Sequence, residues 1–136
     1  MMVDLSSIRK GKIGELAVIK DLCGDRYGYD VYVPVVDDNQ VDLIVETKLG
    51  RFDKVNVKHV IKLKSKTSME LRVRQHHIKK RVDVMAVYYE PIGIAYIPFR
   101  DMKYPKSINL ALFTAVNNQD KRRKYFYQYM RYPEFE

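Results

Sequence analysis

The 136-residue sequence contains one cysteine, Cys23, and no tryptophan. A single cysteine excludes an intrachain disulfide, and cysteine-based zinc sites need more thiolates than this. No apolar run approaches the roughly 20 residues that a membrane-spanning helix requires. Residues 1–12 lack the apolar segment of a secretory signal peptide. These absences predict a cytoplasmic protein that does not enter a membrane.

Positive charge is in excess, because 25 Lys and Arg residues against 17 Asp and Glu residues give a formal net charge of +8. Such a charge favours a polyanionic partner, and nucleic acid is the commonest one. An anionic membrane surface is the alternative, but no long amphipathic basic helix supports it. Hydrophobic residues make up 46% of the chain. This is enough for a single folded domain over residues 1–136.

The hydrophobic pattern predicts one helix followed by a mostly β body. The helix is expected to start at Ser6 and Ser7 and to end near Cys23, before Gly24, with its apolar face formed by Ile8, Val18, Ile19 and Leu22. Gly11 and Gly14 on this helix would allow another backbone to approach closely. Strands are expected at residues 29–33, 41–46, 54–63, 69–73, 82–89, 93–98 and 108–114. Residues 121–131 have the pattern of a short helix, and residues 117–136 are expected to form a basic, aromatic appendage. The fold class is therefore α/β, with an N-terminal helix packed on a central mixed β-sheet.

Polar residues of a particular kind interrupt two of these strands. Asp42 lies in the run VDLIV at residues 41–45, and Asn56 and Lys58 lie in VNVK at residues 55–58. Asn56 and Lys58 project from one face of their strand, because they are two residues apart. Glu15 lies on the apolar face of the helix. An acid on one strand and a polar-x-Lys pair on the next would suit a magnesium-dependent nuclease centre.

Each of these residues also has a purely structural interpretation. Asp42 would be a strand-edge acid beside a turn, or the partner of a lysine. Asn56 and Lys58 would belong to a solvated basic face that Lys62 and Lys64 continue, and Glu15 would be a surface acid near Lys12. Taken one at a time, these structural roles are favoured. Taken together, in this order and spacing, the residues favour the nuclease.

The same residues resemble the PD-(D/E)xK nuclease superfamily, which includes archaeal Holliday-junction resolvases, restriction enzymes and homing endonucleases. The segment GKIGELA, residues 11–17, resembles its first helix, with Glu15 in the acidic position. Residues 42–45 and 55–58 resemble the strands that carry the aspartate and the (D/E)-x-K element. Residues 29–34 resemble the strand that follows this helix. Weaker likeness continues through residues 82–88 and 95–98, and these segments and residues 117–119 resemble an intron-encoded endonuclease branch. The resemblance implies a restriction-endonuclease-like arrangement of the helix and sheet.

Asn56 departs from the family pattern, because the motif has an acid at this position. In the intron-encoded branch the position is similar to a glutamine, so an amide there is compatible with the family. An amide carries no charge, and metal affinity should therefore be lower unless Asp38, Glu46 or Glu15 compensates.

The resemblance implies a DNA endonuclease that uses Mg2+, with Mn2+ able to substitute. Asp42, Asn56, Glu15 and the carbonyl of Val57 would hold the metal, and Lys58 would orient the attacking water or stabilise the developing charge. A homodimer is expected, since two strand cuts need two centres. Branched DNA of the Holliday-junction type is the expected substrate. The alternatives are a sequence-specific homing or restriction-type endonuclease, a DNA-binding protein whose centre has decayed, and a structural subunit. A viral or mobile-element gene would fit as well as a cellular one.

Basic residues on either side of the predicted centre are expected to bind DNA phosphates. They are Lys12, Lys62, Lys64, Arg72, Arg74, Lys79, Lys80, Lys121, Arg122, Arg123 and Lys124. The last four precede Tyr125, Phe126 and Tyr127, and aromatic rings among cations also suit base stacking. A solvated terminal helix is the alternative for this segment. A histidine metal site is disfavoured, because His59 points to the apolar face of its strand and His76 and His77 are adjacent and diverge.

Overall fold

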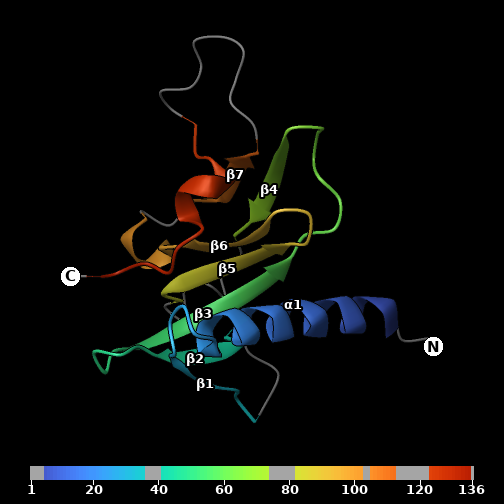
Figure 1. The fold of residues 1–136 in the computed structure, drawn as a ribbon. Helices are drawn as coiled ribbons and strands as arrows, with labels where there is room; N and C mark the ends of the chain where they lie inside the picture. Colours follow the sequence, from blue (N-terminus) through green and yellow to red (C-terminus); the bar gives the residue numbers. More distant parts are fainter. Residues whose placement is uncertain (1–4, 36–40, 74–81, 103–104, 113–122, 136) are drawn as a thin grey trace.

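The computed structural model describes residues 5–35, 41–73, 82–102, 105–112 and 123–135 (Figure 1). Its main element is a five-stranded sheet with the strand order β1-β2-β3-β5-β6. The strands are β1 (Asp30–Tyr32), β2 (Leu43–Glu46), β3 (Phe52–His59), β5 (Val84–Tyr89) and β6 (Gly93–Ile97). All neighbours are antiparallel except β3 and β5, which are parallel, so the sheet is mixed.

Two further layers cover this sheet. Helix α1 (Leu5–Cys23) lies along one face, and an antiparallel ribbon of β4 (Ser68–Arg72) and β7 (Ser107–Ala111) lies beyond the other (Figure 1). Two short 3-10 helices, η1 (Phe99–Asp101) and η3 (Phe126–Tyr129), complete the described elements. The predicted α/β fold, a helix packed on a mixed sheet, is confirmed.

Strand β5 shows how the core is divided. Val84 and Ala86 pack with α1, whereas Met85 and Val87 pack with the ribbon, and all four are 0% exposed. Successive side chains of a strand point to opposite faces, so a strand covered on both sides is apolar at every position. This explains the unbroken apolar run that marks β5 in the sequence.

Helix α1 differs from its prediction in three details. It begins at Leu5, ahead of the predicted serines. Ile8 is 57% exposed, because the first turns of α1 extend beyond the sheet (Figure 1). A Cβ on Gly14 would lie 2.9 Å from the Cβ of His59, whereas a Cβ on Gly11 would meet nothing within 4 Å. Gly14 therefore allows close packing against side-chain atoms of β3, whereas the predicted close approach at Gly11 is wrong.

Strand β3 ends earlier than the sequence pattern predicts. Its parallel ladder with β5 stops at His59, paired with Tyr88, and Ile61 is 48% exposed. Val60 still donates its N–H to the carbonyl of Tyr88 in β5 at 2.9 Å, and the predicted alternation of residues 61–63 lies beyond the end of the strand. The other strands match their predicted ranges to within a few residues at each end, the usual uncertainty of such boundaries.

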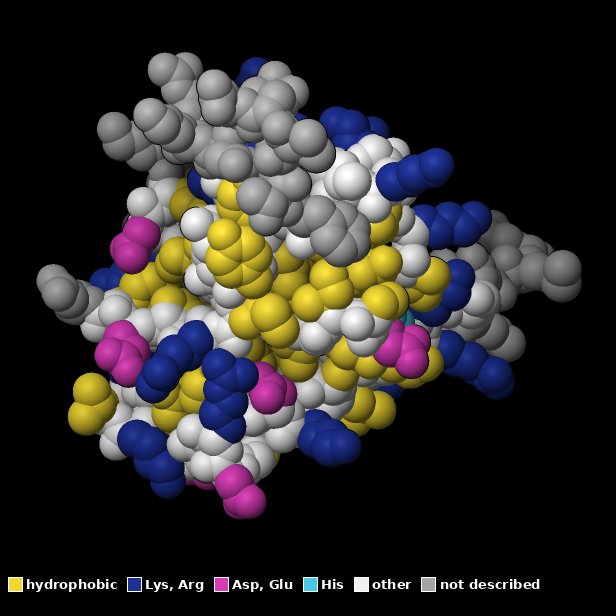
Figure 2. All heavy atoms as spheres, turned by 45° about the horizontal axis from the view of Figure 1, so that its top comes forward, with side chains coloured by type: hydrophobic (Ala, Val, Ile, Leu, Met, Phe, Trp, Pro, Cys, Tyr) yellow, Lys and Arg dark blue, Asp and Glu magenta, His cyan; other side chains and the backbone are white. Residues whose placement is uncertain are grey.

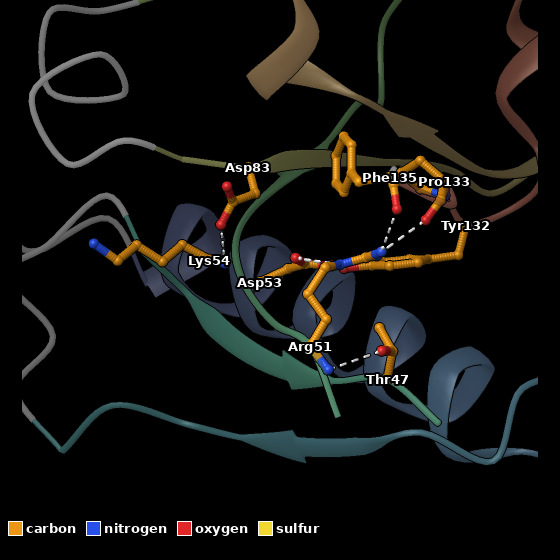
Figure 3. A network of polar contacts seen from close by, with 8 residues as sticks. All are labelled: Thr47, Arg51, Asp53, Lys54, Asp83, Tyr132, Pro133 and Phe135. Carbon is orange, nitrogen blue, oxygen red and sulfur yellow. Dashed lines mark hydrogen bonds and ion pairs between the residues drawn. The ribbon is translucent and has the colours of Figure 1, made fainter. Parts of the chain in front are cut away.

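The C-terminal segment is part of the core over residues 123–135, so the predicted appendage and the predicted helix are both wrong there. The helical pattern yields one 3-10 turn, in which Phe126 is 1% exposed, and Tyr132 is 2% exposed. Figure 3 shows why this segment is held: the Tyr132 hydroxyl donates to Oδ2 of Asp53 at 2.7 Å, and Arg51 donates to the carbonyls of Pro133 and Phe135. Long-range contacts of aromatic side chains override the local helical spacing.

No helix in the described residues combines the length and the apolar character needed to cross a bilayer.

Candidate nuclease centre

Asp42 and Asn56 face each other across β2 and β3. The antiparallel register pairs Leu43 with Val55, and the backbone N–H of Asp42 donates to the carbonyl of Val55 at 2.9 Å. Asp42 therefore stands directly opposite Asn56, just before β2 begins. Leu43 and Val55 point toward α1, so Asn56, the next residue of β3, lies on the other face of the sheet, where its amide contacts the Asp42 carboxylate.

The Asp42 carboxylate is tightly held. Its Oδ2 accepts the backbone N–H of Val57 at 2.7 Å and Nδ2 of Asn56 at 3.2 Å. An ionised carboxylate only accepts hydrogen bonds, and this fixes the orientation of the amide, with Nδ2 toward Asp42 and Oδ1 turned away. Asn56 is 3% exposed, and this Oδ1 atom accepts no hydrogen bond from the protein.

A buried oxygen that accepts no hydrogen bond from the protein costs about 1–3 kcal/mol of stability. Next to a carboxylate, such an oxygen is chemically suited to a hard divalent cation, which prefers carboxylate and amide oxygens. The residues therefore fit a magnesium or manganese ion. Within the described ranges, no three Asp, Glu, His or Cys side chains are grouped so as to hold a metal. A cation at this place would depend on one carboxylate, the amide, water and the substrate phosphate.

Lys58 follows two residues after Asn56 in β3 and is half-buried. Strand alternation puts its side chain on the same face as Asn56, opposite Val87 of β5 in the parallel register. Its ammonium group thus belongs to the Asp42 side of the sheet. The order acid, amide, lysine is the one that the sequence predicts.

Glu15 is placed differently from the other predicted site residues. It lies on α1, which packs against the Val57 face of β3, and its carboxylate forms an ion pair with Lys12 at 2.9 Å. Its side chain is only 17% exposed. The structure thus brings Asp42, Asn56 and the Val57 backbone together, with Lys58 beside them, and assigns Glu15 to the helix that covers the opposite face.

His59 has a structural role. Its Nδ1 contacts the backbone carbonyl of Lys10 at 2.6 Å, and its ring lies 4.9 Å from that of Tyr88. Gly14 packs against its Cβ. These contacts join α1 to β3, as expected for a hydrogen-bonded histidine at the edge of a core. His76 and His77 lie outside the described residues.

A second polar cluster lies at the hairpin that joins β2 and β3 (Figure 3). Asp53 is 1% exposed and accepts two-pronged hydrogen bonds from Arg51, at 2.8 to 3.1 Å, together with the Tyr132 hydroxyl. Burial and the hydrogen bond to Asp53 raise the pKa of the Tyr132 phenol. Because both carboxylate oxygens of Asp53 accept hydrogen bonds from these partners, we interpret the cluster as an anchor that holds the C-terminal segment to the hairpin, and not as a reactive site.

The predicted DNA-binding residues fall into three groups. Lys12 and Lys64 are exposed but pair with Glu15 and Glu70, the latter at 2.8 Å. Lys62, Arg72, Arg123 and Lys124 are exposed. Arg74, Lys79, Lys80, Lys121 and Arg122 lie outside the described residues.

A cavity of about 430 Å³ adjoins the ribbon, and its lining includes Lys64, Ser107, Asn109, Arg123 and Lys124. The hydrogen bond from Lys64 lowers the pKa of Glu70. Ser107 and Asn109 are residues that the sequence analysis missed. The signal was present, because residues 107–111 alternate polar and apolar.

Two comparisons with known proteins identify the family and the fold of the chain. The family model of the PD-(D/E)XK endonuclease matches residues 5–132. A solved structure of a bacterial homing endonuclease, I-Ssp6803I, superposes with a TM-score of 0.61 at 21% identity, covering 90% of this chain and 86% of that chain. At this identity the likeness concerns the fold, which is restriction-endonuclease-like. No curated protein matches the chain. The family match extends over almost the whole described chain, and the protein belongs to the PD-(D/E)XK endonuclease family.

Proposed function

We propose that this protein is a divalent-metal-dependent endonuclease that hydrolyses DNA phosphodiester bonds at the centre formed by Asp42, Asn56 and Lys58. The observation that carries the proposal is the juxtaposition of the Asp42 carboxylate and the Asn56 amide, 3.2 Å apart across β2 and β3, with Lys58 on the same face. Family membership supports the reaction class.

The roles of the residues follow from their chemistry. Asp42, Asn56 and the carbonyl of Val57 would hold Mg2+ or Mn2+, whereas Glu15, predicted as a further ligand, lies on the helix that packs on the Val57 face of β3. A bound cation of this kind polarises a phosphate and lowers the pKa of a water molecule. The N–H of Val57 and the Asn56 amide hold the Asp42 carboxylate in one orientation. Lys58 stabilises the negative charge that develops on the phosphate or orients the attacking water.

Two classes of DNA substrate are candidates. The homing activity named for the structural neighbour and the polar ribbon beside the sheet support a sequence-specific duplex. The small size and positive charge of the chain support branched DNA, cut as by a Holliday-junction resolvase. In either case two strand cuts need two centres, so a homodimer is the proposed active form.

The proposal is tested by cleavage of labelled four-way junction, plain duplex and single-stranded DNA with Mg2+, Mn2+ or EDTA. Cutting should require the divalent metal. Asp42→Ala should abolish it, and Lys58→Ala should slow it by on the order of 10² to 10³-fold. The matched controls are Asp30→Asn, an exposed acid of β1, and Lys54→Ala, an exposed lysine of β3, and both should cut normally.

The outcome also decides among the alternatives. Paired metal-dependent cuts in the junction alone would identify a resolvase, whereas cuts at one duplex sequence would identify a homing-type enzyme. Tight DNA binding with no cutting under any metal would refute the nuclease proposal. The centre with Asn56 would then be a decayed one that retains DNA binding.

A further inference from the structure

We propose that the β4–β7 ribbon reads DNA sequence by entering the major groove, with Arg72 and Asn109 contacting base edges. This inference rests on the proposed function and names the recognition element that the nuclease centre lacks.

The two faces of the ribbon have opposite character. Met69, Leu71, Ile108 and Leu110 are at most 3% exposed and pack into the core. The alternate residues of both strands face solvent, and those that are exposed are Glu70, Arg72, Ser107 and Asn109. The antiparallel register places Glu70 opposite Asn109 and Arg72 opposite Ser107. The outer face is therefore a compact group of hydrogen-bonding side chains on a rigid support.

The dimensions of the ribbon suit the major groove of duplex DNA. Each strand has five residues, and at about 3.3 Å per residue the ribbon is about 16 Å long. This length corresponds to about five base pairs at a rise of about 3.4 Å each. A major groove about 12 Å wide admits a two-stranded β-ribbon. Arg recognises guanine with two hydrogen bonds, and Asn recognises adenine in the same manner.

Cations border the outer face on both strands. Lys66 precedes β4 and Lys106 precedes β7. The backbone carbonyl of Lys106 accepts a hydrogen bond from the N–H of Val73. Arg123 and Lys124 lie beside the end of β7, where the carbonyl of Lys124 accepts the N–H of Ala111 at 2.8 Å. Figure 2 shows Lys and Arg side chains gathered along the upper right of the molecule, the side on which β4 and the segment before it lie in Figure 1. Exposed cations of this kind would hold the phosphates on either side of the groove.

The ribbon and the nuclease centre share one side of the five-stranded sheet. Val41, next to Asp42, and Val73, next to Arg72, both pack against the cluster that contains Met85 and Val87. In the parallel register those two residues pair with Asn56 and Lys58. The ribbon therefore lies on the side of the sheet that bears Asn56 and Lys58, whereas α1 covers the opposite side.

The test is selection of binding sites from randomised duplex DNA by the full-length Asp42→Ala protein in EDTA, which separates binding from cutting. A preferred block of base pairs should emerge. Adding Arg72→Lys keeps the positive charge but removes the two-pronged donor, so discrimination at one guanine should fall by about 5- to 150-fold while affinity for unselected DNA is retained. Asn109→Ala should relax a different position.

Two controls identify phosphate contacts and folding effects. Lys106→Ala should weaken binding to all sequences equally and reduce the dependence of log K on log salt by about one unit. Lys20→Ala, an exposed lysine on α1 across the sheet, should change neither property. Urea midpoints of all variants should agree, because the substituted side chains are exposed.

The results separate this inference from the proposed function. Selected sites that are unchanged by Arg72→Lys and Asn109→Ala, or the absence of any preferred sequence, would overturn the ribbon as a reader even if the protein cuts DNA. A ribbon-dependent preference in a protein that never cuts would support the reader and refute the nuclease.

Discussion

Replacing Asn56 with Asp would restore the acid of the (D/E)-x-K motif, and we expect it to destabilise the metal-free protein. Nδ2 of Asn56 lies 3.2 Å from Oδ2 of Asp42, and Asn56 is only 3% exposed. The substitution exchanges a hydrogen-bond donor for a negatively charged oxygen at this short distance. The two carboxylates would then repel each other unless a proton or a cation lies between them.

The size of the effect can be bounded in two ways. Two unit charges 3.2 Å apart repel by about 5 kcal/mol at an effective dielectric constant of about 20. The pair can instead bind one proton, which costs about 4 kcal/mol at pH 7 for a carboxyl group with an ordinary pKa near 4. The loss of unfolding free energy should therefore be at most about 4 kcal/mol at pH 7. The loss should shrink by about 1.4 kcal/mol for each unit that the pH falls toward 4, because protonating the carboxylate pair of the folded state then costs less free energy.

The assay is urea unfolding in EDTA at pH 5 and pH 7, repeated with Mg2+ or Mn2+. A divalent ion at a concentration of 100 times its Kd should restore about 2.7 kcal/mol. The matched control is the double variant Asp42→Asn with Asn56→Asp, which reverses the pair and preserves one carboxylate and one amide. Equal losses in the single and the double variant, or a loss that does not change with pH, would refute the reasoning.

Three further predictions concern the packing of the fold and are checked by urea unfolding. Gly14→Ala should be less stable than Gly11→Ala by about 1–3 kcal/mol, because only the first added Cβ meets His59, at 2.9 Å; equal midpoints would contradict this helix packing. Burial and the bond to Asp53 raise the pKa of Tyr132, so the folded protein keeps a proton that the unfolded chain loses above about pH 10. Stability should therefore fall as the pH rises from 10 to 11, and Tyr132→Phe should reduce this fall by about 1 kcal/mol. Leu110→Ala should cost about 2–5 kcal/mol, since Leu110 is 0% exposed beneath the ribbon; a loss under about 0.5 kcal/mol would mean that the ribbon does not pack on the sheet.

The elements that were predictable from the sequence are those with a local cause. The apolar run of β5 reflects burial on both faces, and the turn between β2 and β3 needs the positive φ of 82° that Gly50 adopts. Asn56 and Lys58 could be predicted to share a face because a strand has a period of two residues. The family resemblance supplied the order of these residues.

The C-terminal segment and the ribbon show where local patterns are insufficient. Aromatic residues three and four positions apart predict a helix, but Tyr132 donates to Asp53, which lies 79 residues away in the chain. The pairing of β4 with β7 likewise joins segments that are far apart in sequence. Neither contact has a signal within a window of neighbouring residues.

By itself the sequence determined the class of fold, and it predicted the two strands of the proposed centre with Asp42, Asn56 and Lys58, because strand alternation and charge are local properties. Only the tertiary structure decided that the Asn56 amide turns its nitrogen toward Asp42, that the helix bearing Glu15 packs on the Val57 face of β3, and that the C-terminal aromatics belong to the core. These are contacts between segments distant in the chain, and their free energies depend on which partners the fold brings within hydrogen-bonding distance.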